Sequence, residues 1–158
     1  MSTYQGFGEL KSPADLVEKL RHDLERLENS PHNQYAAFDF FVTAEHIPGW
    51  IYPNNWADRK KHKSSVPLLR ITSHIANGAK HFEATERRHA SVTDIEKERY
   101  VEAGYVEEDY FEDSILIHLT SEEAKAIGTQ IIDAKLLASR VLQYWEDYFI
   151  AEAKDKMV

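Results

Sequence analysis

Apolar side chains recur every three or four positions near the start of the chain, which is the spacing of an amphipathic helix. The stripe consists of Leu16, Leu20, Leu24 and Leu27. Ser12 is a suitable N-cap, Pro13 suits the first helical position, and Asn29-Ser30-Pro31 should end the helix. The pattern predicts a helix over residues 13–29, preceded by a flexible arm over residues 1–11.

The next segment is apolar in almost every direction around a helix, so the pattern predicts a second helix over 32–48 that is buried on most sides. Pro48 and Gly49 should stop or kink it. Its polar residues Asp39, Thr43 and His46 are spaced by four and three, which places them on one line. Polar groups on a buried helix need hydrogen-bonding partners.

A third helix is predicted over 65–83, with an apolar face and a polar stripe roughly opposite it. The apolar face consists of Leu68, Ile71, Ile75, Ala79 and Phe82, and the stripe of Arg70, His74, Asn77 and His81. We expect this stripe to meet the polar line of the preceding helix. The polar seam predicted in this way consists of Asp39, Thr43, His46, Arg70, His74, Asn77 and His81.

The pattern changes after residue 91 and changes again at Thr120. Residues 92–119 contain a five-residue repeat beginning at Tyr100, Tyr105 and Tyr110 and then a β-branched run, which predicts a small antiparallel β insertion. Thr120 and Glu123 match a capping box, and apolar residues continue at helical spacing to residue 152. The predicted fold is therefore mainly α: one domain over 1–158, a four-helix up-and-down bundle with a β insertion between helices 3 and 4.

Composition narrows the classes of function. The chain has 158 residues, 42% of them hydrophobic, which suffices for the core of one domain. Nineteen Lys and Arg against 27 Asp and Glu give a net charge of −8, which argues against wrapping a polyanion, although residues 59–63 form a local basic run. No apolar run approaches the roughly 18 residues of a membrane span, and the first residues do not resemble a signal peptide. We expect a cytoplasmic protein with no membrane partner.

A metal site is one hypothesis for the polar seam. The sequence contains no cysteine, so a metal would need His, Asp or Glu ligands. His46, His74 and Asp39 could supply them from facing helices. His74 and His81 are seven residues apart, which is about 10 Å along a helix and too far for both to bind one ion.

A nuclease is a second hypothesis. Arg70 and His74, with His81 beyond them, resemble the motif of the HEPN family of small helical-bundle ribonucleases and nucleic-acid-associated proteins. In that family four to six residues separate the arginine from the histidine, and a polar residue often follows the arginine; here three residues separate Arg70 from His74, and Ile71 follows. The resemblance implies a dimeric bundle in which Arg70 binds phosphate and His74 or His81 assists attack by a ribose hydroxyl.

The third hypothesis, which we favour, is a binding or interaction module. The segments FFVTAEHIPGW and IANGAKHF resemble segments of small bacterial proteins of unassigned function, and this resemblance implies no activity. The seam would recognise a small polar ligand, or RNA in the nuclease alternative, or would only fix the register of the helices. The sequence contains no phosphate loop or dinucleotide motif, so we expect no cofactor.

Aromatic residues crowd two places in the sequence. Trp50 and Trp56 lie in one predicted turn, and a second group lies near the end of the last helix, consisting of Tyr144, Trp145, Tyr148 and Phe149. One small bundle would not bury so many large rings on all sides. The sequence therefore predicts a homodimer.

Overall fold

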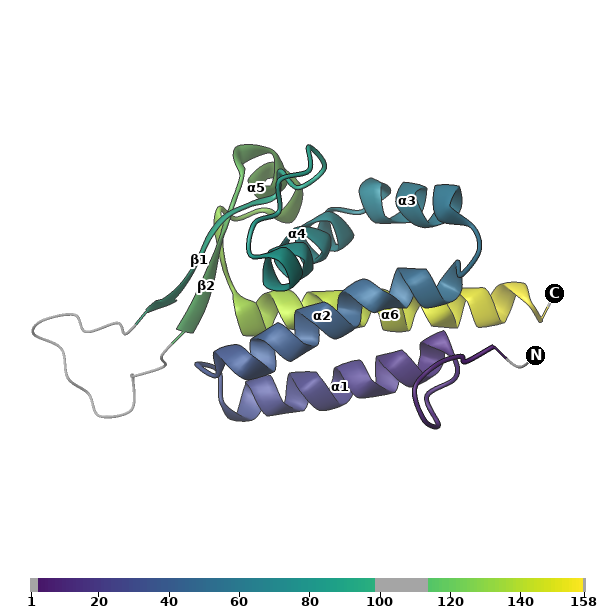
Figure 1. The fold of residues 1–158 in the computed structure, drawn as a ribbon. Helices are drawn as coiled ribbons and strands as arrows, with labels where there is room; N and C mark the ends of the chain where they lie inside the picture. The colour runs from purple at the N-terminus through teal and green to yellow at the C-terminus, as the bar shows by residue number, and fades with distance from the viewer. Residues whose placement is uncertain (1–2, 99–113, 158) are drawn as a thin grey trace, which may run out of the picture.

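The computed structural model describes residues 3–98 and 114–157, and in these residues six helices pack with one three-stranded antiparallel sheet. The elements are α1 (Pro13–Asn29), α2 (Gln34–Ile51), α3 (Trp56–Ser65), α4 (Pro67–His81), β1 (Val92–Glu98), β2 (Ser114–Leu119), α5 (Ser121–Ile127), β3 (Ile131–Asp133) and α6 (Ala134–Asp155). Figure 1 shows α1, α2 and α6 side by side, with the sheet and α5 at one end and both termini at the other. A mainly helical fold with a small antiparallel sheet is therefore confirmed.

The first two helices follow local signals closely. The α1 helix has the predicted bounds, and Ser12 forms a capping box with Asp15, whose backbone nitrogen donates to Ser12 Oγ over 3.3 Å. Asn33 caps α2. The predicted end of this helix at residue 48 is wrong, because the helix continues through Pro48 to Ile51. Trp50 and Ile51 pack against the core, and Tyr52 N donates to the Pro48 carbonyl.

The structure places a helix, α3, where the sequence predicted an aromatic turn and a basic loop. Asn55 caps it by accepting a hydrogen bond from Asp58 N over 3.0 Å. No residue of α3 is buried, so it has no apolar stripe that would predict it. Helix α4 begins at Pro67 and ends at His81, so the prediction of 65–83 is correct except at its ends.

The single helix predicted over 120–152 is wrong, because the structure divides this segment into α5, β3 and α6. Gly128 ends α5 in a left-handed conformation with φ 95°. The next residues pair with β2, and Asp133 then caps α6. Thr120 is the N-cap residue of α5, as expected, but its side chain forms no capping hydrogen bond, because Thr120 Oγ1 donates instead to the carbonyl of Ala90.

The sheet closes one end of the helical core. Its order is β1-β2-β3, and Ile115, Ile117 and Leu119 of β2 alternate toward the buried side. The strands at 92–98 and 114–119 match the predicted β insertion, whereas β3 was not predicted. Residues 99–113, with most of the tyrosine repeat, lie outside the described residues.

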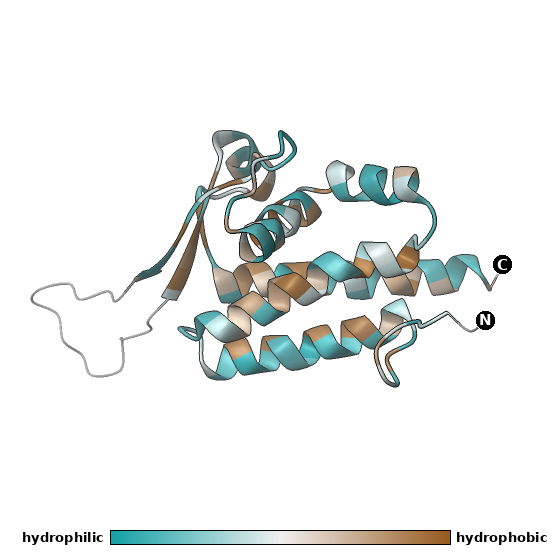
Figure 2. Ribbon diagram, in the orientation of Figure 1, coloured by the Kyte–Doolittle hydropathy of each residue, from teal (hydrophilic) through white to brown (hydrophobic). Residues whose placement is uncertain are grey.

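The core lies between the helices and this sheet. Trp145 of α6, Phe40 of α2 and Leu20 of α1 are among its fully buried side chains. Figure 2 shows the apolar residues of the long helices on their facing sides and the polar residues outside. None of the helices in the described part of the chain is long and apolar enough to span a membrane.

Candidate functional site

The predicted polar seam divides, because Asp39 and Thr43 bind α1 instead of α4. Arg26 Nη1 donates to Asp39 Oδ2 over 2.9 Å. Thr43 Oγ1 donates to the buried carboxylate of Asp23 over 3.1 Å. The prediction that Asp39 and Thr43 face Arg70 and its neighbours is therefore wrong. The four-and-three spacing identified one face of α2 but could not identify the helix that this face contacts.

Arg70 and His74 connect α4 to later parts of the chain. Arg70 donates to Glu123 Oε1 of α5 from Nε and Nη2, over 2.9 and 2.7 Å, and to the carbonyl of Ser64. His74 Nδ1 accepts hydrogen bonds from Ser91 N and Val92 N, over 3.2 and 3.0 Å. Burial lowers the pKa of His74, which favours the neutral ring that can accept these bonds. Both side chains position α5 and β1.

His46 and Asn77 both line a cleft between α2, α3 and α4, which has a volume of about 610 Å³. We call it the basic cleft. Its charged and polar lining residues are Glu45, His46, Arg59, Lys63, Asn77, Lys80 and Arg88. Four of these are cations, although the whole chain has a net charge of −8. The remaining lining residues are apolar or lack a side chain, and they include Phe38, Val42 and Trp50.

Glu45 connects the three helices at this cleft. It accepts hydrogen bonds from Lys63 Nζ of α3 and, over 3.1 Å, from Ser73 Oγ of α4. The Glu45 and Lys63 side chains are each 16% exposed, so the pair is largely shielded from solvent. Glu45 therefore fixes the positions of α3 and α4 relative to α2.

The other cations of the basic cleft are less fully paired. Arg88 binds Glu86 over 2.7 Å. Arg59 and Lys80 form no ion pair with any residue in 3–98 or 114–157. A smaller hollow of about 170 Å³ adjoins the cleft, where Trp56 and Lys60 lie near Arg59 and Lys63. The cations therefore form a continuous basic surface.

His81 lies at a different cavity, of about 300 Å³, whose lining includes Asn77, Glu86 and His89. Both ring nitrogens of His89 are buried without a hydrogen-bond partner, and its ring lies 5.5 Å from that of His74. Burial, followed by the charge of Arg88, lowers the pKa of His89 to about 4. Arg70, His74 and His81 were expected to be catalytic in a nuclease, but His74 lines the cavity between α2, α4 and the sheet, His81 lines a different one, and Arg70 lines neither.

The predicted metal site is not formed. Asp39 contacts α1, His46 lies at the basic cleft and His74 binds the backbone of β1. Within the described ranges, no group of three or more His, Cys, Asp or Glu side chains is arranged to hold a metal ion. The structure therefore does not bring the three candidate ligands His46, His74 and Asp39 together.

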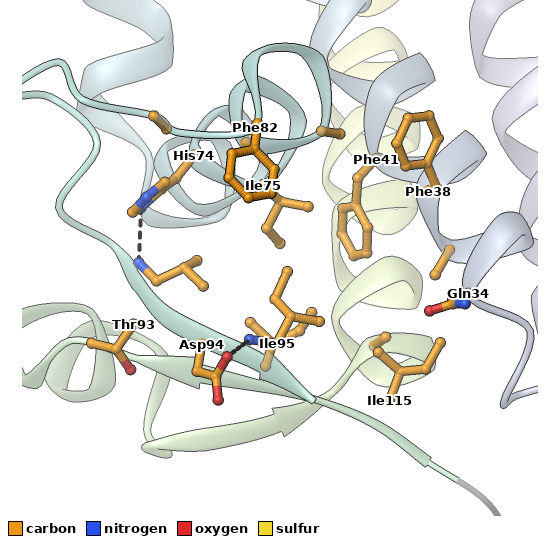
Figure 3. Close-up of a pocket in the computed structure, with 17 residues that line it drawn as sticks. Gln34, Phe38, Phe41, His74, Ile75, Phe82, Thr93, Asp94, Ile95 and Ile115 are labelled. Carbon is orange, nitrogen blue, oxygen red and sulfur yellow. Dashed lines mark hydrogen bonds between the residues drawn. The ribbon is translucent and has the colours of Figure 1, made fainter. Parts of the chain in front are cut away.

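An apolar cavity of about 410 Å³ lies between α2, α4 and the sheet (Figure 3). Figure 3 shows Phe41, Ile75, Ile95 and Ile115 pointing toward one another across it. The carboxylate of Asp94 is directed away from them and accepts a hydrogen bond from Ile95 N over 2.9 Å. The interior of this cavity is therefore uncharged.

Sequence reasoning missed Glu45, Lys80 and Arg88 as site residues, and treated Arg59 and Lys63 only as part of a charge run. Lys80 follows Asn77 by three positions, so it belongs to the same helical stripe and could have been included. Arg59 and Lys63 share a face only if residues 56–65 are helical. Arg88 lies outside every helix, and the sequence offers no signal that it reaches the cleft.

In comparisons with known proteins, no family model, curated protein or solved structure matches the chain. The function is therefore argued from the geometry of the basic cleft and the apolar cavity.

Proposed function

We propose that this chain is a binding module whose basic cleft recognises a small phosphate-bearing anion. The observation that carries the proposal is the convergence of Arg59, Lys63, Lys80 and Arg88 on one cleft of an acidic protein. Cations held close together repel one another, and a bound anion would remove that cost. Of these four cations, only Lys63 and Arg88 have a carboxylate partner among the described residues, so Arg59 and Lys80 are free to bind a ligand.

The cleft also offers groups that would orient such a ligand. Guanidinium groups bind phosphate oxygens through two parallel hydrogen bonds, while lysines act as point charges. His46 and Asn77 add hydrogen-bonding groups at the same cleft. Because Glu45 holds α2, α3 and α4 together, the cleft is formed before the ligand arrives, which reduces the entropy cost of binding.

Isothermal titration with inorganic pyrophosphate at low ionic strength tests this proposal. We expect saturable one-to-one binding that weakens at least about tenfold in Arg59→Gln and in Lys80→Gln, since each removes a charge-assisted contact. Lys125→Gln is the matched control, because it removes one positive charge from the exposed surface of α5, away from the cleft. Circular dichroism of each variant verifies that the fold is retained.

Two outcomes would contradict the proposal. One is the absence of binding, and the other is equal weakening by Lys125→Gln, which would indicate a nonspecific charge effect. Cleavage of RNA by the wild type, lost in His74→Ala with the fold intact, would instead support the HEPN-like ribonuclease hypothesis.

A further inference from the structure

The basic cleft and the apolar cavity are neighbours that share a wall. Phe38 of α2 lines both hollows, and its side chain is half exposed. Successive residues of α4 also divide between them, with Asn77 and Lys80 on the basic cleft and Gly78 and Ala79 on the apolar cavity. The two hollows are therefore neighbours at Phe38 and at residues 77–80 of α4.

The two hollows differ sharply in chemistry. The basic cleft carries four cations, whereas the apolar cavity is walled mainly by carbon. His74 lines the apolar cavity, and its Nδ1 atom already accepts hydrogen bonds from two backbone N–H groups. Asp94 is directed away from the centre (Figure 3). A charged ligand group would therefore be stable only at the basic end, and an apolar group only at the other.

Gly78 lines the apolar cavity, and the absence of a side chain at this position leaves space in it. Glycine is the poorest helix former after proline, yet Gly78 lies inside α4. A Cβ atom at this position would meet nothing within 4 Å apart from its own helix backbone and chain neighbours, so close packing does not require glycine. A larger side chain here would instead occupy space in the cavity. At about 410 Å³, the cavity is within the size range of small-molecule sites.

We infer that one amphipathic anion occupies both hollows, with its phosphate head in the basic cleft and an unbranched alkyl or acyl chain passing Phe38 into the apolar cavity. This inference rests on the proposed function and specifies its ligand class. The cations attract the head, and burial of the chain supplies further affinity in proportion to its apolar area. The half-exposed ring of Phe38 covers the chain where it passes between the two hollows.

A series of alkyl phosphates from ethyl to octyl, each below its micelle concentration, tests the inference by isothermal titration. We expect affinity to rise up to about fourfold for each added methylene while the chain enters the cavity. Gly78→Leu should flatten this dependence because its side chain fills the cavity, but should leave pyrophosphate binding unchanged. Gly78→Ala is the matched control: it adds one methyl group without a clash, retains most of the cavity, and should preserve the dependence on chain length.

The outcomes separate this inference from the proposed function. Pyrophosphate binding together with equal affinity for ethyl and octyl phosphate would overturn the inference and leave the basic cleft as an anion site. Failure of every anion to bind would overturn both. A chain-length dependence that Gly78→Leu does not change would place the alkyl chain elsewhere and overturn the inference. Binding to vesicles of phosphatidylcholine and phosphatidylglycerol, without binding of any soluble alkyl phosphate, would also overturn it.

Discussion

At the scale of single residues, the chain uses polar side chains mainly to connect elements that are distant in sequence. Glu45 joins α2 to α3 and α4, Arg70 joins α4 to Glu123, and His74 holds the start of β1. These contacts are partly or fully shielded from water, where a hydrogen bond left without its partner is costly. Removal of one partner should therefore affect stability more than the loss of an exposed ion pair.

Glu45→Gln should destabilise the protein by roughly 1–3 kcal/mol, because the shielded ammonium of Lys63 loses its carboxylate. Urea unfolding followed by circular dichroism measures the change. Glu18→Gln is the control, since it breaks the exposed pair of Glu18 with Arg21 and should cost less than about 1 kcal/mol. Equal destabilisation by the two variants would show that Glu45 does not connect the three helices as described.

Three histidines should make the protein sensitive to acid. The pKa values of His62, His74 and His89 are lowered by burial, to about 4 for His89. The unfolded chain then binds more protons than the folded chain, so stability is retained above the ordinary histidine pKa of about 6.5 and is lost as pH falls below it. We expect the melting temperature to fall between pH 7.5 and pH 5, and His89→Phe to reduce that fall. An unchanged pH dependence in this variant would contradict a neutral His89 ring whose two nitrogens are buried.

At the scale of elements, α3 differs from the other helices because it has no buried residue. The side chain of His62 connects α3 to the rest of the protein, because its ring lies between Tyr52 and Tyr144. Its Nδ1 is 3.1 Å from Tyr52 Oη and its Nε2 is 2.6 Å from Tyr144 Oη. Since α3 also carries Arg59 and Lys63, its attachment determines whether the basic cleft keeps its shape.

His62→Ala should loosen α3 while α1 and α6 keep their packing, because most core contacts lie outside α3. Hydrogen exchange measured by mass spectrometry should show faster exchange over residues 56–65 and little change over residues 13–29. His22→Ala, on the exposed face of α1, is the control for loss of a histidine. Equal acceleration throughout the chain would mean that His62 supports global stability and not the local attachment of α3.

At the scale of the whole molecule, charge and aromatic side chains are distributed unevenly. The net charge is −8, yet the basic cleft concentrates four cations. Most of the rings that predicted a dimer from sequence pack within one chain: Trp145 is fully buried, and Trp50, Tyr144, Tyr148 and Phe149 pack against the core, whereas Trp56 is 63% exposed. The homodimer stays a prediction, which light scattering at high protein concentration would contradict by giving the mass of one chain.

Pyrophosphate affinity should fall several-fold when sodium chloride is raised from about 50 to about 300 mM. Salt screens the attraction between the anion and the cations of the cleft, since the Debye length is about 10 Å at 0.1 M and shorter at higher salt. Titration across this range measures the effect, and sucrose at matched osmolality is the control for solvent effects unrelated to charge. An affinity that does not depend on salt would contradict recognition by the basic cleft.

The sequence alone determined those structural features that depend on interactions between residues close together in the sequence. The bounds and cap of α1, the apolar stripe of Leu16, Leu20, Leu24 and Leu27, and the mainly helical class all follow from spacing and local hydrogen bonding. Two strands of the sheet could be predicted for the same reason. Such features require contacts only a few residues apart.

Tertiary structure decided which faces meet. Asp39 and Thr43 do lie on one face of α2, as their spacing of four predicts, but this face contacts α1, because helical spacing defines a face and not the element that it contacts. Pairing of β3 with β2 interrupts the helical pattern after Gly128, and α3 forms without an apolar stripe because it attaches through His62 and Lys63. The basic cleft combines residues from 38 to 88 for the same reason: long-range packing, which local periodicity does not encode, brings their side chains together.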